Sequence, residues 1–274
     1  MGFLTGKKFL ITGISSNRSI AYGIAKACAR EGAELALSYN NERFKERVQG
    51  FADEFGAGQV IKLDASSDES IDLAALELAN RWTDGFDGFD GFDGFVHSIG
   101  WAPRDSISGS FLEGASREGF LSAMNVSVYS YIAMAKRMVP LMAGHKASLL
   151  TLSYLGGEKV VPNYNTMGLC KAALESATRY IAADVGPQGI RANTLSCGPI
   201  KTLAASGIKG FSSMLAQCKA VSPTRSLVSI DEVGNTAAFL LSDNSLGITA
   251  ETIYIDGGFN ALACCVDQTA SENA

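Results

Sequence analysis

A tyrosine and a lysine, Tyr164 and Lys171, stand seven residues apart, and a second tyrosine, Tyr154, precedes Tyr164 by ten residues. If the segment is an α-helix, seven residues make close to two turns and place the pair on one face. An ammonium group beside a phenol favours the phenolate, so the pairing predicts a Tyr164 pKa below the ordinary value of about 10. This arrangement suits acid chemistry, although many solvated helix faces carry such a pair. Its meaning depends on whether the rest of the chain supplies a cofactor site.

Short apolar segments alternate with helical patterns along the chain. We predict strands at residues 7–12, 34–39, 59–63, 93–98, 147–152, 191–196 and 251–255, and helices at 19–31, 42–55, 68–82, 116–143, 164–186 and 231–242. Near-continuous apolar strands are typical of parallel strands covered on both faces. The pattern predicts an α/β fold with a Rossmann-type, doubly wound sheet of seven parallel strands, in a single domain over residues 1–262. A ligand of such a sheet binds at the carboxyl ends of its strands.

The first predicted strand runs directly into a turn that suits a dinucleotide. Gly13 follows the strand and would let a pyrophosphate approach the backbone. Ser19 and Ile20 stand at the start of the next helix, where free N–H groups and the helix dipole favour an anion. The pattern Gly-x-Gly-x-x-Gly is absent, so an ordinary strand–helix connection is the alternative.

Residues after the next three strands extend the predicted dinucleotide site. Asn40 would lie at the adenosine ribose, and no Arg or Lys stands immediately beside it, which favours NADH over NADPH. Arg43 and the lack of a ribose-binding carboxylate keep NADPH open. Asp64 would accept a hydrogen bond from the adenine amine, or it is a helix cap or turn residue. The remaining predicted cofactor contacts are Ala65, Ser98, Ile99 and Gly100.

Composition limits the class of protein. The chain has 274 residues, 47% of them hydrophobic, and a net charge of −5, which fits one large domain and does not favour nucleic acid as a partner. No apolar run reaches the ~18 residues of a membrane span, and the first strand begins too early for a signal peptide, so we expect a cytoplasmic protein. Six cysteines without Cys-x-x-Cys spacing and two histidines predict free thiols, with neither a metal site nor a disulfide framework.

Two segments depart from the strand–helix pattern. Residues 84–95 repeat Asp-Gly-Phe four times. The last copy enters the fourth strand, and we predict that the other copies form an expanded loop at the edge of the sheet. The alternative is an interaction patch made by Phe86, Phe89 and Phe92. Residues 263–274 are predicted to form a polar C-terminal tail.

The motifs resemble those of the short-chain dehydrogenase/reductase family, in its divergent branch of enoyl reductases. Over residues 1–260 the matching motifs are Gly13-x5-Ser19-x-Ala21, His97-Ser-Ile-Gly100, Leu152-Ser-Tyr154-Leu-Gly156, Tyr164-x2-Met167-x3-Lys171, Cys197-Gly-Pro-Ile200-x-Thr202 and Asp256-Gly-Gly-Phe259. Thr151 stands where ordinary family members have a serine, and His97-Ser-Ile-Gly replaces Asn-Asn-Ala-Gly. Both departures count against a carbonyl reductase. The Asp-Gly-Phe expansion is extra, and Asn40 is shorter than the glutamine of the enoyl reductase pattern.

The resemblance implies NADH-dependent reduction of the trans-2 double bond of enoyl thioesters, delivered on an acidic acyl carrier protein during fatty acid elongation. It assigns Tyr164 to the enolate oxygen, Lys171 to the nicotinamide ribose and Tyr154 to the thioester, with a packing role as the alternative for Tyr154. Ile200 and Thr202 would contact the nicotinamide amide and the pyrophosphate. Substrate contacts are implied for Trp101, Ala102, Tyr154, Tyr164, Met167, Ala204, Ile208, Phe211 and Met214.

Residues 199–225 would form a substrate lid, with an ordinary amphipathic helix as the alternative. The stretch 201–225 contains Lys201, Lys209, Lys219 and Arg225 and no acidic residue, which would steer an acidic carrier toward it. The resemblance also implies a homotetramer built on the helices predicted at 116–143 and 164–186 and on the last strand. Two competing functions stay open: reduction of a 3-oxoacyl or steroid-like carbonyl, and dinucleotide binding by a regulator without catalysis.

Overall fold

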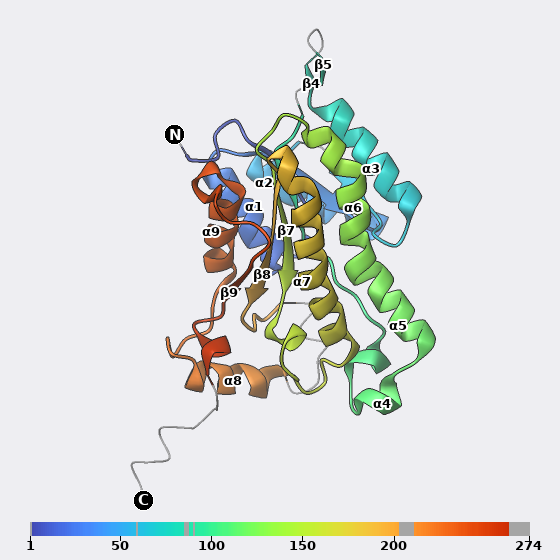
Figure 1. The fold of residues 1–274 in the computed structure, drawn as a ribbon, viewed down its shortest axis with the longest axis vertical. Helices are drawn as coiled ribbons and strands as arrows, with labels where there is room; N and C mark the ends of the chain where they lie inside the picture. The colour runs from blue at the N-terminus through green and yellow to red at the C-terminus, as the bar shows by residue number, and fades with distance from the viewer. Residues whose placement is uncertain (1, 59, 85–87, 90, 203–210, 263–274) are drawn as a thin grey trace, which may run out of the picture.

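The computed structural model describes residues 2–58, 60–84, 88–89, 91–202 and 211–262. Its main sheet has seven parallel strands in the order β3-β2-β1-β6-β7-β8-β9, which confirms the predicted Rossmann-type α/β fold (Figure 1). These strands are β1 (Lys8–Ile11), β2 (Glu34–Tyr39), β3 (Ile61–Lys62), β6 (Gly94–His97), β7 (Ser148–Ser153), β8 (Arg191–Cys197) and β9 (Thr252–Ile255). The strand order reverses between β1 and β6, so the carboxyl ends of these two strands flank the crevice where such sheets bind ligands.

Helices cover both faces of the sheet (Figure 1). They are α1 (Ile20–Arg30), α2 (Glu42–Phe55), α3 (Asp68–Arg81), α4 (Phe111–Gly114), α5 (Arg117–Met124), α6 (Ser130–Met138), α7 (Thr166–Val185), α8 (Phe211–Val221) and α9 (Ile230–Leu241). Successive strand residues point to opposite faces. Phe9 packs with α1, α2 and α9, whereas Leu10 packs with α3, α6 and α7. In the described part of the chain, none of the helices is long and apolar enough to cross a membrane.

The helix predicted at 116–143 is interrupted by a wider turn. Ser116 caps α5 by accepting a hydrogen bond from the Gly119 N–H at 3.0 Å. A π-helical turn, Asn125–Tyr129, then separates α5 from α6, and a 3-10 turn, Val139–Met142, ends the run. Turns of the π type occur frequently at functional sites, and this one carries Ser127, whose hydroxyl bonds the backbone of Trp101 at the cavity described below.

The Asp-Gly-Phe repeat is more structured than the predicted loop. β4 (Thr83–Asp84) and β5 (Gly88–Phe89) form an antiparallel pair. Phe92 is buried and stacks on Trp82 with ring centroids 5.6 Å apart, so it does not belong to an exposed interaction patch. Phe86 lies outside the described residues. The last copy enters β6, as predicted, and β6 is an inner strand of the main sheet.

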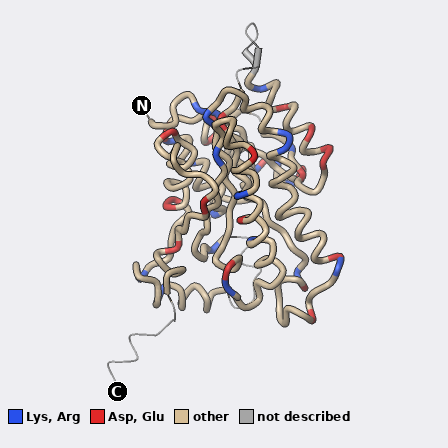
Figure 2. Tube along the Cα trace, viewed as in Figure 1, with Lys and Arg blue, Asp and Glu red and all other residues tan. Residues whose placement is uncertain are grey.

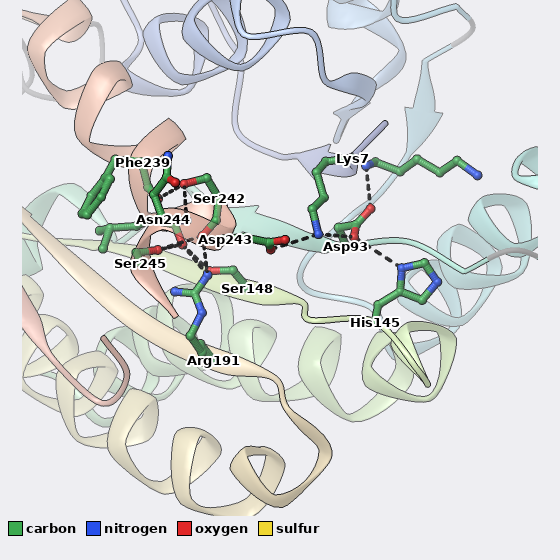
Figure 3. A network of polar contacts seen from close by, with 12 residues as sticks. Lys7, Asp93, His145, Ser148, Arg191, Phe239, Ser242, Asp243, Asn244 and Ser245 are labelled. Carbon is green, nitrogen blue, oxygen red and sulfur yellow. Dashed lines mark hydrogen bonds and ion pairs between the residues drawn. The ribbon is translucent and has the colours of Figure 1, made fainter. Parts of the chain in front are cut away.

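The last copy of the repeat anchors β6 through Asp93 (Figure 3). Its buried carboxylate accepts hydrogen bonds from the Lys8 N–H at 2.9 Å and from the Lys7 ammonium at 3.2 Å. It also lies 3.3 Å from Nδ1 of His145. These contacts join the amino ends of β1 and β6, at the opposite end of the strands from the crevice.

The crossing of α1 and α9 depends on two glycines. A Cβ at Gly234 would lie 2.3 Å from the Gly23 carbonyl oxygen, and a Cβ at Gly23 would lie 2.2 Å from the Ile230 carbonyl oxygen. We expect Gly234→Ala to lower the free energy of unfolding by roughly 1–3 kcal/mol, because two helix backbones must move apart. Urea denaturation would measure this loss.

Gly50→Ala is the matched control, since Gly50 is also helical and a Cβ there meets nothing within 4 Å. It should leave stability unchanged or raise it by up to ~1 kcal/mol. Equal losses in the two variants would contradict the account of the crossing.

Candidate active site

A cavity of about 420 Å³ opens at the carboxyl ends of β1, β6, β7 and β8. The predicted site residues that line it are Gly13, Ser19, Ile20, Ser98, Ile99, Gly100, Trp101, Ala102, Tyr154, Tyr164, Met167, Lys171, Ile200, Thr202, Phe211 and Met214. The lining residues that the sequence analysis did not assign are Ser15, Ile107, Leu152, Ser153, Val161, Cys197, Gly198 and Pro199. Most of these residues are sequence neighbours of predicted residues at strand ends. That position is the one feature of the sequence that would have predicted them.

A hollow on α5 has a larger volume, about 570 Å³, but it contains none of the predicted residues. Its lining residues are Arg117, Glu118, Leu121, Ser122 and Asn125. The tyrosines, the lysine and the glycine turn meet only in the cavity at the strand ends, among the described residues, and this cavity is the candidate active site.

The predicted adenosine contacts do not line this cavity. Asn40 is exposed directly after β2. The Asp64 carboxylate accepts hydrogen bonds from the Ser66 N–H at 2.9 Å and from the Ser66 hydroxyl at 2.6 Å. Asp64 is thus a turn residue, and an adenosine contact of Asn40, Asp64 or Ala65 stays a prediction. The predicted substrate contacts Ala204 and Ile208 lie outside the described residues.

Tyr164 and Lys171 both line the cavity, but they do not belong to one helix. α7 begins at Thr166, and Tyr164 lies in the preceding turn, so the predicted helix start at 164 is wrong. The neighbours Asn163 and Asn165 have φ angles of 64° and 43°, in the left-handed region that asparagine tolerates better than most residues. This turn brings the phenol of Tyr164 to the cavity wall beside the first turns of α7.

Burial controls the ionisation of the pair. It raises the pKa of Tyr164, so the predicted lowering of that pKa by Lys171 is wrong. It lowers the pKa of Lys171 to about 8, while Nζ donates to the Leu152 carbonyl oxygen at 2.7 Å. At neutral pH Tyr164 therefore keeps its hydroxyl hydrogen and most of Lys171 is charged. The pair supplies a hydroxyl donor near an ammonium group rather than a phenolate.

Tyr154 follows β7 and packs edge-on against Tyr164, with ring centroids 5.1 Å apart. Its hydroxyl contacts Met214 Sδ of α8 at 3.5 Å, and burial raises its pKa to about 12. The ring thus has the packing role that was the alternative for this residue, while the hydroxyl stays protonated at the cavity wall. The packing role and a role as second hydroxyl donor are compatible.

His97 lies beneath the strand ends and does not line the cavity. It is fully buried, with Nδ1 3.1 Å from the Thr151 hydroxyl and Nε2 2.8 Å from the Ser130 hydroxyl. Burial, with the nearby charge of Lys171, lowers the pKa of His97 to about 3. Thr151, which replaces the serine of ordinary family members, is therefore bonded beneath the strand ends rather than aimed at a substrate.

The π-helical turn positions Trp101 at the cavity through a pair of hydrogen bonds. The Ser127 hydroxyl accepts from the Trp101 N–H at 2.9 Å and donates to the Trp101 carbonyl oxygen at 2.9 Å. Ser127 is fully buried. The apolar pattern of the predicted helix gave no signal of this contact, because it depends on the extra residue in the π turn.

The β1–α1 turn fits the pyrophosphate of a dinucleotide. Gly13 has a φ of 81°, and a Cβ there would lie 1.9 Å from the Ser98 carbonyl oxygen. The first turn of α1 has no acidic residue, and the Ser19 hydroxyl donates to the Ser16 carbonyl oxygen at 2.7 Å instead of capping the helix. The start of α1 is thus open to an anion beside a backbone that approaches closely.

Comparisons with known proteins agree with this geometry. Residues 13–260 match the family model described as enoyl-(acyl carrier protein) reductase. The chain is 52% identical over 265 residues to the enoyl-[acyl-carrier-protein] reductase [NADH] of Salmonella typhimurium, which covers 96% of this chain and 97% of that protein. The solved enoyl-[acyl-carrier-protein] reductase (NADH) of Aquifex aeolicus superposes with a TM-score of 0.91 at 44% identity, over 96% of this chain and 100% of that chain.

The reductase of Anaplasma phagocytophilum, solved in complex with NAD, superposes with a TM-score of 0.90 at 40% identity, over 97% of this chain and 98% of that chain. These matches confirm the enzyme class and the NADH cofactor predicted from the sequence. The chain belongs to the family of NADH-dependent enoyl-[acyl-carrier-protein] reductases.

Proposed function

We propose that this enzyme reduces the trans-2 double bond of enoyl thioesters delivered by an acyl carrier protein, with Tyr164 as the donor to the thioester oxygen and Lys171 as the cation that binds the cofactor. The observation that supports these roles is the convergence of Tyr154, Tyr164, Lys171 and the Gly13 turn on one cavity.

The residues of the cavity suit the charge that develops in the reaction. NADH, when bound, supplies a hydride for the β-carbon of the substrate. Negative charge then develops on the thioester oxygen as an enolate, and one hydroxyl donor aimed at it is worth roughly 3–4 kcal/mol. Tyr164 suits this role because its raised pKa keeps the hydrogen on the hydroxyl. Tyr154 would be a second hydroxyl donor near the thioester. The enolate then takes a proton at its α-carbon, from solvent or from a relay.

Lys171 would bind the ribose hydroxyls of the nicotinamide half of the cofactor. Its ammonium has three N–H donors, and the Leu152 carbonyl oxygen accepts one of them. The backbone contact holds the ammonium at the cavity wall, and the other donors can turn toward a bound ribose.

The apolar side of the cavity would hold the acyl chain, and the predicted lid, residues 199–225, would close over it. Val161, Met167, Phe211 and Met214 line this side, as is usual for a site that binds an apolar ligand. Phe211 and Met214 belong to α8, so the described part of the lid already contacts the cavity. The proposed function therefore includes closure of residues 199–225 over the acyl chain.

The acidic carrier would dock beside α8. Lys201, Lys219 and Arg225 are exposed there. α8 itself contains no acidic residue, so no red position lies along it (Figure 2). Lys209 lies outside the described residues. We expect Lys219→Glu to raise the KM for a carrier-bound enoyl substrate about tenfold at low salt, because a reversed charge at the rim of an interface slows association. Steady-state kinetics at two salt concentrations would measure it.

Two controls make this carrier prediction specific. The KM for crotonyl N-acetylcysteamine, a neutral thioester without a carrier, should not change in Lys219→Glu. Lys146→Glu, at an exposed lysine beyond the amino end of β7, should leave both KM values unchanged. A tenfold rise with the neutral thioester as well would place Lys219 in the substrate site instead of the docking surface.

We also propose a homotetramer in the cytoplasm. Leu121, Ile132, Leu169 and Tyr180 of α5, α6 and α7 are 58%, 41%, 45% and 79% exposed in the single chain, and association would cover them. Light scattering would give the mass of the assembly. The cysteines in the described part of the chain, Cys28, Cys170, Cys197 and Cys218, are free and buried, which suits a reducing compartment.

The loss of NADH absorbance with crotonyl-CoA and with acetoacetyl-CoA tests the reaction itself. We expect turnover with the enoyl thioester and little with the 3-oxoacyl thioester. The reverse preference would support a carbonyl reductase. Binding of NADH without turnover of either thioester would support a non-catalytic regulator.

A further inference from the structure

A buried carboxylate, Glu175, lies behind the wall of the active-site cavity. It stands on α7, one helical turn after Lys171, and accepts a hydrogen bond from the hydroxyl of Ser153. The exposed fractions of Glu175 and Ser153 are 7% and 5%. Burying a carboxylate costs free energy unless polar partners compensate, and none of the steps above uses this one.

Ser153 links Glu175 to the residues of the reaction. It is the last residue of β7 and lines the cavity. On one side stands Leu152, whose carbonyl oxygen accepts from Lys171 at 2.7 Å. On the other side stands Tyr154, whose ring packs on the catalytic tyrosine. Consecutive residues at the end of β7 are therefore bonded to two residues of α7.

The turn after β7 also closes over the carboxylate. A Cβ at Gly157 would lie 3.1 Å from Oε1 of Glu175 and 3.0 Å from the Ala172 backbone nitrogen. The turn thus packs directly on α7 at this point. Any change in the length of the Glu175 side chain acts on the strand end and on this turn together.

From this geometry we infer that Glu175 is a positioning residue for the reduction: through Ser153 it holds the end of β7, with Tyr154 and the carbonyl acceptor of Lys171. The inference rests on the proposed roles of Tyr154 and Lys171. It adds a residue that touches neither substrate nor cofactor.

The surroundings of Glu175 set its charge. Burial raises its pKa most, and the Ser153 hydrogen bond lowers it. The other groups that act on it are Glu158, which raises the pKa, and Arg179 and Lys171, which lower it. Glu175 in turn contributes to the raised pKa of Tyr254 in β9. Because burial is the largest of these effects, the pKa of Glu175 is raised overall.

The surroundings of Lys171 make its titration a sensitive readout. Burial lowers the pKa of Lys171 to about 8, and Cys170, Cys197 and Glu175 act in the opposite direction. His97, which also interacts with the charge of Lys171, is neutral because its own pKa is about 3. Of these neighbours, only Glu175 carries a carboxylate, so removing its charge should lower the pKa of Lys171 further.

Two substitutions separate the effect of the Glu175 charge from the effect of its side-chain length. Glu175→Gln keeps an acceptor for Ser153 and removes the charge. Glu175→Asp keeps the charge and shortens the side chain, so that the bond to Ser153 is lost. The dissociation constant of NADH would be measured by fluorescence from about pH 6 to about pH 10, a range that covers the titration of a lysine with a lowered pKa, and turnover with crotonyl-CoA would be measured beside it.

We expect the midpoint of the loss of NADH binding to move to lower pH in Glu175→Gln, with turnover at low pH close to that of the parent. In Glu175→Asp the midpoint should stay in place, and kcat should fall about tenfold as Tyr154 and Leu152 shift. A role in folding alone would weaken binding equally at every pH. An unmoved midpoint in Glu175→Gln, or parent-like turnover in Glu175→Asp, would overturn the inference.

Asp184→Asn is the matched control, because Asp184 is an exposed carboxylate on the same helix, nine residues after Glu175. It should change neither the midpoint nor kcat. Thermal melting of all variants shows whether they fold. Failure of the parent to oxidise NADH with crotonyl-CoA would refute the proposed function, whereas the NADH-binding arm tests Glu175 without any turnover.

Discussion

Tyr164→Phe is expected to lower kcat for crotonyl-CoA reduction by about 10²–10³-fold, the usual effect of removing one donor to a developing oxyanion. The ring that packs against Tyr154 is retained, so the free energy of unfolding and the dissociation constant of NADH should change little. Stopped-flow absorbance of NADH under single-turnover conditions would measure the hydride-transfer step apart from product release.

Tyr180→Phe is the control for this substitution, because Tyr180 lies on α7 away from the cavity and phenylalanine keeps the ring that the proposed homotetramer would cover. It should leave kcat unchanged. Within the site, the loss of kcat in Tyr154→Phe is compared with the loss in Tyr164→Phe. If it lowers kcat more than Tyr164→Phe does, the roles proposed for the two tyrosines are exchanged.

Lys171→Ala is expected to have a comparable effect through the cofactor. Removing one partner of a buried charged contact costs roughly 2–5 kcal/mol, so NADH should bind at least about 30-fold more weakly. The Leu152 carbonyl oxygen also loses its side-chain donor, which should lower the free energy of unfolding by about 1–3 kcal/mol. Titration calorimetry with NADH and urea denaturation separate the two losses, and Lys146→Ala is an exposed control.

The pH dependence gives an independent check on Lys171. Burial lowers its pKa to about 8, so the ammonium is present below that pH and is lost as the pH rises through it. NADH binding by the parent should therefore weaken as the pH rises above about 8. This dependence should disappear in Lys171→Ala. Binding by the parent that stays constant up to about pH 10, where an ordinary lysine titrates, would contradict the role of the ammonium.

The fold was predictable because both faces of the sheet are covered. Strands such as β1, β2 and β9 are apolar over most of their length, and such runs separate cleanly from the helices. The cavity followed from the same pattern, since residues after parallel strands gather at one end of the sheet. Gly13, Ser98 and Tyr154 meet there for that reason.

What the sequence did not predict depends on contacts between distant segments or on the depth of burial. The pattern of apolar residues continues through 125–129, so it does not distinguish a π turn from an α turn, and the contact of Ser127 with Trp101 was missed. Ser153 and Glu175 are ordinary residue types far apart in the chain. The pKa of Tyr164 was expected to follow the nearby charge, but it follows burial, which spacing alone does not show.

The anchoring of Phe92 and Asp93 has a consequence for how this chain can vary over evolution. Both residues are fixed in the core, Phe92 against Trp82 and Asp93 against the amino end of β1. Gain or loss of a whole Asp-Gly-Phe unit by replication slippage would therefore be absorbed upstream, around β4 and β5, and not in β6. The catalytic cavity lies at the other end of the strands. A change in the number of repeat units would therefore leave the residues that line this cavity in place.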